Sequence, residues 1–321
     1  MDNFWKEYPI IKNDLEAVTK IMKKNIACRE KIVENVILEL IDAGGKQLRP
    51  AFLIIAARFG EFNKEEIYPL AAVIEMLHMG TLVHDDIIDD SMLRRGIETV
   101  QAKLGKEYAV YIGDFLFCRC FKILSEHSSL KSINIDSNTM SRMCMGEIGQ
   151  FSSKFNQQVS VNKYLKRISS KTAELFSLSF YTGAVESKCS NKLSRDLSKI
   201  GHNIGMAFQI IDDILDFTGD EKVIGKPKGN DIKQGIYTLP LIYVLQKESL
   251  RLSPILSKNS FDEIDINNIV NIVKELGGIE KSRALAVRYT ERSFDLINTL
   301  PSCESKNLLL KITENLLIRI Y

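Results

Sequence analysis

Four aspartates in the segment 81–96 are the first residues whose type and spacing suggest chemistry. Asp85 and Asp89 lie four positions apart, so on a helix their carboxylates project from one face about one turn (~5.4 Å) apart, with Asp86 beside them. Two carboxylates that close repel unless a cation lies between them. Oxygen ligands of this kind suit Mg²⁺, which usually completes its coordination with water and substrate phosphates. The arginines at positions 94 and 95 can bind phosphate oxygens in a bidentate fork, so the segment predicts a diphosphate held by metal and arginine.

The same arrangement returns later in the chain as Asp212, Asp213 and Asp216. A single acidic run is also typical of a solvated helix end, because charge runs usually lie on the surface. A second D-D-x-x-D motif is improbable as surface decoration, so the two motifs together favour a metal-dependent site.

A glycine-rich basic segment, G-G-K-Q-L-R-P at 44–50, precedes the first aspartates. Paired glycines let the backbone approach a ligand, and Lys46 and Arg49 supply positive charge. The segment is consistent with an anion site, although glycine and lysine are also ordinary residues at helix ends. His78 lies seven residues before Asp85 and therefore nearly on the same helix face, so it is either a packed core residue or a ligand for phosphate oxygen.

The elements that must position these residues are predicted to be helical nearly throughout. No proline occurs between Pro69 and Pro227, and apolar residues recur at spacings of three and four, as they do from Leu165 to Phe180. Long helices with short connections predict an all-α bundle. The two aspartate motifs are consistent with two similar helices that face each other across a cavity.

Composition argues against several classes of protein. The chain of 321 residues is 45% hydrophobic, and its 43 basic and 41 acidic side chains give a formal net charge of +2. The protein therefore has no strong overall electrostatic field that would attract nucleic acid or a membrane surface. No signal peptide or transmembrane segment is expected, which indicates a cytoplasmic protein. The six cysteines form no C-x-x-C pair, so neither a zinc site nor a disulfide framework is indicated.

A series of segments between Gly44 and Pro240 resembles, in order, the motifs of the trans-isoprenyl (polyprenyl) diphosphate synthases. The segments are G-G-K-Q-L-R-P, E-M-L-H-M-G-T-L-V-H-D-D-I-I-D-D-S-M-L-R-R-G, G-D-F-L-F, G-E-I-G-Q, the Lys171-Thr172 pair, G-M-A-F-Q-I-I-D-D-I-L-D-F-T-G-D and G-K-P-K-G-N-D-I-K-Q-G-I-Y-T-L-P. Within the family, the chain looks most like the catalytic large subunit (component II) of heptaprenyl-type synthases.

The resemblance implies an all-α isoprenoid-synthase fold, with a deep central cavity and a single domain over residues 1–321. It implies a Mg²⁺-dependent prenyltransferase that condenses isopentenyl diphosphate with an allylic diphosphate, farnesyl or geranylgeranyl. The product would be a hexaprenyl to octaprenyl diphosphate for quinone side chains or related isoprenoids. A homodimer is expected, and a small regulatory subunit remains an open alternative.

The resemblance also assigns roles to residues of this chain. Metal ligation falls to Asp85, Asp89 and Asp212, with support from Asp86, Asp213 and Asp216. Binding of the allylic diphosphate falls to Arg94, Lys171, Thr172, Gln209 and Lys226. Binding of isopentenyl diphosphate falls to Lys46, Arg49, His78 and Arg95.

Two positions depart from the family pattern, and three other functions are alternatives. Gln47 replaces a basic residue, and Ile236 replaces a lysine that many members carry before T-L-P, which removes one expected diphosphate contact. A short-chain synthase, making farnesyl or geranylgeranyl diphosphate, is one alternative. A class I terpene cyclase would carry an N/D-x-x-S/T-x-x-x-E element in place of the second motif. A non-catalytic partner subunit would be expected to have lost aspartates from one motif.

Product length is predicted from the residues just before the first aspartates. Leu77, Gly80 and Thr81 lie one to two turns earlier, about 6–12 Å along a helix from the metal ligands. Gly80 and Thr81 leave room where short-chain members carry a bulky aromatic, so the growing tail is expected to pass. The alternative is that Gly80 lets two helices pack closely.

Overall fold

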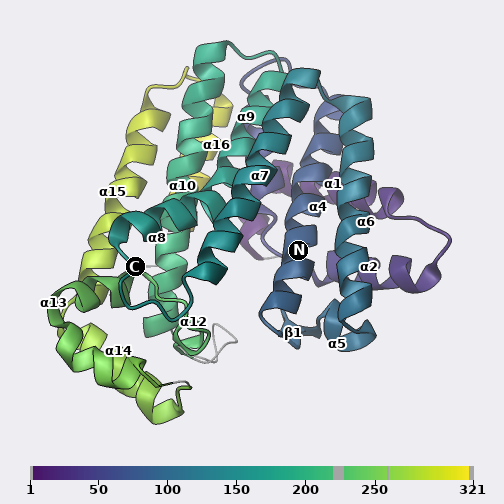
Figure 1. The fold of residues 1–321 in the computed structure, drawn as a ribbon. Coiled ribbons are helices and arrows are strands. Elements are labelled where there is room, and N and C mark those ends of the chain that lie inside the picture. The colour runs from purple at the N-terminus through teal and green to yellow at the C-terminus, as the bar shows by residue number, and fades with distance from the viewer. Residues whose placement is uncertain (1–2, 220–227, 259, 318–321) are drawn as a thin grey trace. The chain divides into compact units, whose positions relative to one another are not determined.

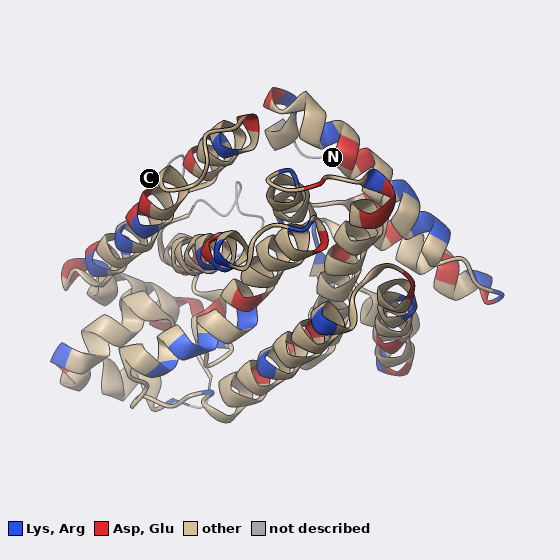
Figure 2. Ribbon diagram, turned by 90° about the horizontal axis from the view of Figure 1, so that it is seen from above, with Lys and Arg blue, Asp and Glu red and all other residues tan. Residues whose placement is uncertain are grey.

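The computed structural model describes residues 3–219, 228–258 and 260–317, and these are helical nearly throughout (Figure 1). The all-α prediction is confirmed. Within the described ranges the sheet is limited to two short antiparallel strands, β1 (Leu93–Arg94) and β2 (Ile97–Glu98). Lysine, arginine, aspartate and glutamate are mixed along most of the helices (Figure 2), in keeping with a net charge close to zero.

One compact unit comprises Met1–Ser137, Leu178–Ser198 and Cys303–Ser305. Besides the two strands, it contains η1 (Asn3–Glu7), α1 (Pro9–Asn25), α2 (Lys31–Ala43), α3 (Leu48–Ala57), α4 (Lys64–Ile88), α5 (Val100–Leu104) and α6 (Lys106–His127). The first predicted aspartate motif and the glycine-rich basic segment both belong to this unit.

A second compact unit comprises Asn138–Ser177, Lys199–Ser302 and Lys306–Tyr321. It contains α8 (Val161–Ile168), η2 (Ser169–Ala173), α12 (Asn230–Lys233), α13 (Leu239–Leu256), α14 (Glu263–Glu275) and α15 (Gly278–Asn298). The chain passes between the units within α7 (Leu130–Ser152), α9 (Glu174–Glu186), α10 (Asn191–Thr218) and α16 (Glu304–Leu317). That residues 1–321 act as one catalytic domain stays a prediction.

Helix α4 is the central helix of the first unit because it is apolar on nearly every face. Its N-cap Asn63 accepts a hydrogen bond from the Glu65 backbone N–H at 3.1 Å, and two glutamates in its first turn suit the positive end of the helix dipole. By length and composition alone the helix could cross a membrane, but 78% of its most apolar window is buried inside the protein. A helix that is hydrophobic all round is expected in a core.

Two glycines set the close packing of α4 against α6. A Cβ added to Gly113 would lie 2.2 Å from His84 Nε2, and one added to Gly80 would lie 2.7 Å from Cε1 of Phe117. The space beside Gly80 is therefore taken by the Phe117 ring. This contact favours the packing interpretation of Gly80 over open room for a substrate tail.

Candidate active site

The first aspartate motif lies at the C-terminal end of α4, where its members have different surroundings. Asp86 is buried, with 4% exposure. Its Oδ1 accepts a hydrogen bond from Arg94 Nε at 2.8 Å and forms an ion pair with Nη2 of the same arginine at 2.7 Å. Asp85 and Asp89, one turn apart, are half-buried. The predicted metal ligands are thus the accessible positions, while the middle aspartate holds the first strand of the hairpin that follows.

Gln101 fixes the same region and carried no signal in the sequence. Its Nε2 donates to the carbonyl oxygen of Asp86 at 2.6 Å and to that of Ser91 at 2.9 Å. These two bonds tie the start of α5 to the end of α4. Because Gln101 is itself buried, the segment that carries Arg94 and Arg95 is held at both ends.

A cationic cluster forms where α3, α4 and the hairpin meet in the first unit. Burial, and then the positive charges of Arg49, Arg95 and Arg94, lower the pKa of His78 well below its usual value. Burial also lowers the pKa of Arg49 to about 10, although the negative charge of Glu75 acts to raise it. The structure therefore brings together three of the four residues predicted to bind isopentenyl diphosphate, with His78 neutral at physiological pH.

Glu75 is the residue of this cluster that sequence reasoning missed. It is buried, with 5% exposure, and lies one turn before His78 on α4. Burial raises the pKa of its carboxyl group, while the nearby Arg49 and Arg95 act to lower it. One carboxylate among two arginines leaves an excess of positive charge, which suits an anionic ligand.

The glycine-rich segment 44–50 is shaped by contacts with residues remote in sequence. A Cβ on Gly45 would lie 2.7 Å from the guanidinium carbon of Arg95, so the glycine lets that side chain lie against the backbone. The fully buried Trp5 donates its Nε1–H to the carbonyl oxygen of Lys46 at 2.5 Å. Lys46 itself is exposed, at the start of the turn into α3.

Gln47, where the family pattern has a basic residue, serves a structural role here. Its backbone is left-handed, with φ of 46°, and its buried side chain donates to Thr19 Oγ1 at 3.2 Å. A charged side chain directed into this buried position would need a partner. The structure thus accounts for an uncharged residue at this departure from the motif.

The second aspartate motif lies on α10 in the second unit and repeats the division seen in the first. Asp213 is buried, with 4% exposure, and accepts from Tyr164 Oη at 2.6 Å and from Gln209 Nε2 at 2.8 Å. Asp212 is exposed and Asp216 half-buried. Burial raises the pKa of Asp213 to about 7, although both hydrogen bonds favour its ionised form.

The predicted diphosphate ligands Lys171 and Thr172 lie in η2, a π-helical turn between α8 and α9. Thr172 donates its hydroxyl hydrogen to Gln209 Oε1 at 2.6 Å, which links it through Gln209 to Asp213. Lys171 Nζ forms an ion pair with Glu147 on α7 at 2.9 Å. Turns with π geometry concentrate at functional sites, because the extra residue reorients neighbouring side chains.

The structure thus groups the predicted residues into two sets, one in each compact unit. Sequence reasoning assigned no role to the partners Glu75, Gln101, Glu147 and Tyr164. Glu75 and Glu147 lie within the segments E-M-L-H and G-E-I-G-Q, but the sequence does not show what they contact. Lys226 lies outside the described residues. Within the described part of the chain, no group of three histidine, cysteine, aspartate or glutamate side chains is arranged to hold a metal by itself.

Comparison with known proteins places the chain in a family. The polyprenyl synthetase model matches residues 30–273. Heptaprenyl diphosphate synthase component 2 of Geobacillus stearothermophilus is 36% identical over 94% of this chain and 94% of its own length. Geranylgeranyl pyrophosphate synthase of Lactobacillus brevis superposes with a TM-score of 0.94 at 33% identity, covering 99% of both chains.

A third relative, polyprenyl synthase of Caulobacter crescentus, was solved with calcium and isoprenyl diphosphate. It is 29% identical, has a TM-score of 0.92 and covers 98% of this chain and 97% of its own. The family match extends over both aspartate motifs and the glycine-rich basic segment. The chain therefore belongs to the polyprenyl synthetase family and is a polyprenyl diphosphate synthase, a prenyltransferase.

Proposed function

We propose that this prenyltransferase uses Mg²⁺ to condense isopentenyl diphosphate with farnesyl or geranylgeranyl diphosphate. The observation that carries the proposal is the division within each motif, where accessible aspartates stand beside a buried one that is fixed by hydrogen bonds. We assign metal ligation to Asp85, Asp89 and Asp212. Asp86, Asp213 and Asp216 support them.

The donor chemistry of these residues fits Mg²⁺. All are carboxylates, and the described residues provide no cage of three protein ligands. Mg²⁺ is commonly bound by one or two carboxylates, with waters and substrate phosphates completing its shell. When bound, the metal would supply Lewis-acid stabilisation of the departing diphosphate.

We assign the cluster in the first unit to isopentenyl diphosphate. Arg49 and Arg95 carry the positive charge, Lys46 is exposed at the edge of the cluster, and neutral His78 can donate a hydrogen bond without adding charge. Glu75, buried against the arginines, is proposed to orient them. Isopentenyl diphosphate keeps its diphosphate during the reaction, so cationic side chains without a metal suit its binding site.

Lys171, Thr172 and Gln209 of the second unit are proposed to bind the allylic diphosphate, and the same role is proposed for Arg94, which belongs to the first unit. Their positions are fixed in advance by Glu147, Asp213 and Tyr164, so little reorganisation would be needed as charge develops on the leaving group. The double bond of isopentenyl diphosphate then attacks the allylic cation. The released diphosphate is proposed to take up the proton, because burial and the neighbouring arginines lower the pKa of His78 and make it a weak base.

We propose that the product is hexaprenyl to octaprenyl diphosphate. The relatives include synthases of both heptaprenyl and geranylgeranyl diphosphate, so their names leave this length open. If the tail passes Gly80, the half-exposed ring of Phe117 is the first obstacle that it meets. Phe117→Ala is then expected to lengthen the product in a mass-spectrometric assay, whereas an unchanged product would place the limit elsewhere.

We also propose a homodimer in the cytoplasm, with a small second component as an alternative partner. Large apolar side chains on α6 support an interface, since Tyr111 is 73% exposed and Phe121 is 57% exposed. The Geobacillus relative is named as a component, which supports a two-chain enzyme. Light scattering that detects only an active monomer would refute the assembly.

The test of the function is one incubation with farnesyl diphosphate, isopentenyl diphosphate and Mg²⁺, with products resolved by mass spectrometry. Asp85→Ala and Asp212→Ala should each lower turnover at least about 100-fold, because lost metal ligands remove stabilisation of the transition state. Asp90→Ala is the matched control, since Asp90 is exposed and pairs with Lys106 at 2.9 Å. Turnover that is near normal in either test variant would refute the proposal.

A further inference from the structure

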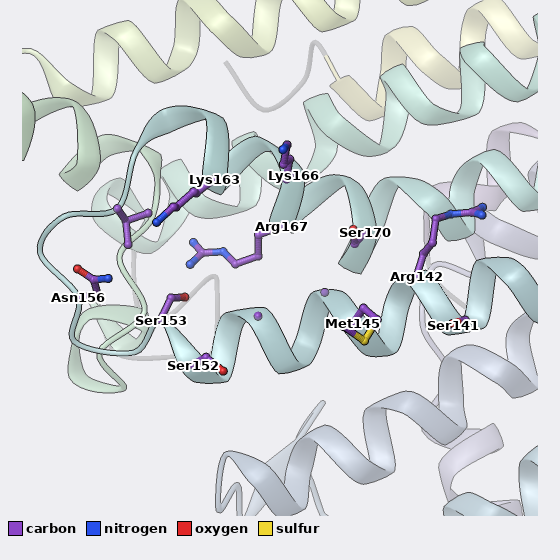
Figure 3. Close-up of a pocket in the computed structure, with 13 residues that line it drawn as sticks. Ser141, Arg142, Met145, Ser152, Ser153, Asn156, Lys163, Lys166, Arg167 and Ser170 are labelled. Carbon is purple, nitrogen blue, oxygen red and sulfur yellow. The ribbon is translucent and has the colours of Figure 1, made fainter.

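A groove between α7 and α8 in the second unit is lined by none of the residues assigned to metal or substrate binding. Its volume is about 580 Å³, within the range of small-molecule sites, and residues from Ser141 to Ser170 line it (Figure 3). The groove is bordered by Lys163, Lys166 and Arg167, and none of its lining residues is acidic. It thus combines a hollow with positive charge. Arg142, which also lines the groove, pairs with Glu174 at 2.8 Å, so the excess charge comes from the other cations.

Two of these cations are directed into the groove. Figure 3 shows Lys163 and Arg167 pointing into the space between the two helices, and Asn156 also lines the groove. Arg167 is fixed in place, because one nitrogen donates to the Tyr237 carbonyl oxygen at 2.8 Å and its guanidinium lies 5.4 Å from the centre of the Tyr164 ring. The guanidinium retains further N–H donors for a ligand.

The charge is not explained by the stability of α8. Lys166 and Arg167 lie in its last turn, where the helix dipole favours cations, but Lys163 lies in its first turn, where a cation is unfavourable. Like charges three and four residues apart on one helix also repel, by about 0.2–0.5 kcal/mol for each pair. Within the described residues, neither Lys163 nor Lys166 has an ion-pair partner.

One of the two glycines of α7 that line the groove is not required by packing. A Cβ on Gly146 would lie 2.6 Å from Cβ of Ser170, so close packing explains that glycine. A Cβ on Gly149 would meet no atom within 4 Å. Glycine inside a helix lowers its stability by about 0.5–1 kcal/mol relative to alanine. At position 149 the lack of a side chain leaves the neighbouring space open.

We propose that this groove binds a phosphate-bearing anion, held by Lys163 and Arg167 with the Asn156 amide. Charged hydrogen bonds from ammonium and guanidinium groups are the usual means of binding phosphate oxygens. The volume exceeds that of an inorganic diphosphate, and the apolar side chains of Met145 and Val159 line the remaining space. The anion is either inorganic diphosphate or the diphosphate of an isoprenoid.

Equilibrium dialysis in EDTA tests the proposal, because the aspartate motifs then hold no metal. Lys163→Glu should weaken one metal-independent site for inorganic diphosphate at least tenfold. Lys131→Glu, an equal charge change at an exposed position near the start of α7, should not. Gly149→Leu fills the groove without changing its charge and should also abolish binding there.

The four proteins share every other phosphate site, so the contribution of those sites cancels. Farnesyl diphosphate that binds tenfold more tightly than inorganic diphosphate would assign the groove to an isoprenoid diphosphate, and equal affinities would assign it to the inorganic anion. Identical binding by the parent and Lys163→Glu would overturn the proposal. So would full retention in Gly149→Leu, since only diffuse surface charge would then be acting.

Discussion

Asp136 on α7 is predicted to make the stability of the first unit depend on pH. It is 4% exposed, and neither carboxylate oxygen meets a donor at hydrogen-bonding distance and angle. Burial, and then the charge of Glu186 on α9, raise the pKa of Asp136 to about 7, and the Thr182 hydroxyl nearby offsets only part of this. The carboxyl group is therefore held largely protonated below pH 7.

The sign and size of this pH dependence follow from the linkage between proton binding and folding. In the unfolded chain the pKa is the ordinary value of 3.8, so between about pH 4 and pH 7 the unfolded state loses its proton first and the folded state is progressively destabilised. At about 1.4 kcal/mol for each pH unit, the loss reaches roughly 2–4 kcal/mol above pH 7. Asp136→Asn, neutral at every pH, should remove it.

Urea denaturation of the parent and Asp136→Asn at pH 4 and pH 8 measures this effect. The difference in the free energy of unfolding between the two proteins is compared at the two pH values. The variant should be more stable by about 2–4 kcal/mol at pH 8 and close to the parent at pH 4. Other titrating groups are common to both proteins and cancel. A constant stability difference at the two pH values would show that Asp136 is not titrating as argued.

Three further outcomes follow from the site. Tyr164→Phe removes one donor from buried Asp213 and should cost about 1–3 kcal/mol in thermal denaturation, and a neutral result would contradict the 2.6 Å hydrogen bond. Glu75→Gln should raise KM for isopentenyl diphosphate more than that for the allylic substrate, and equal effects would refute its positioning role. Gly80→Ala should be destabilising, about 1–3 kcal/mol, and rescued by Phe117→Leu, whereas additive effects would show that the two residues do not meet.

Much of the fold, including the helices that carry the two aspartate motifs, could be predicted because it depends on local sequence. The apolar pattern before Asp85 forms one long buried helix. Asp85 lies in its last turn, and Asp89 is its C-cap, with its backbone N–H bonded to the Asp85 carbonyl oxygen at 2.9 Å. The second motif likewise lies on a long helix. The spacing of apolar residues along a helix and the type of side chain in each motif depend only on neighbours in the chain. Both are therefore the same in the folded structure as in the sequence.

The remainder depends on contacts that no spacing encodes. That Asp86 and Asp213 are fixed by Arg94 and Tyr164 is decided by tertiary packing, and so is the buried position of Glu75 among arginines. The prediction that Gly80 leaves room for the tail treated one helix alone, whereas the Phe117 ring of α6 fills that space. The lack of a side chain at one position of the sequence does not mean that the folded protein has a cavity there.

The hydrogen bond from Trp5 to the Lys46 carbonyl oxygen gives the protein an intrinsic optical reporter. Trp5 is the only tryptophan in the chain, so its fluorescence arises from a single known position. It is fully buried and bonded to the segment that carries Lys46 and leads to Arg49. Any displacement of that segment by a bound diphosphate would change the polarity around one indole ring. Emission from the unlabelled protein can thus follow events at the basic cluster in real time.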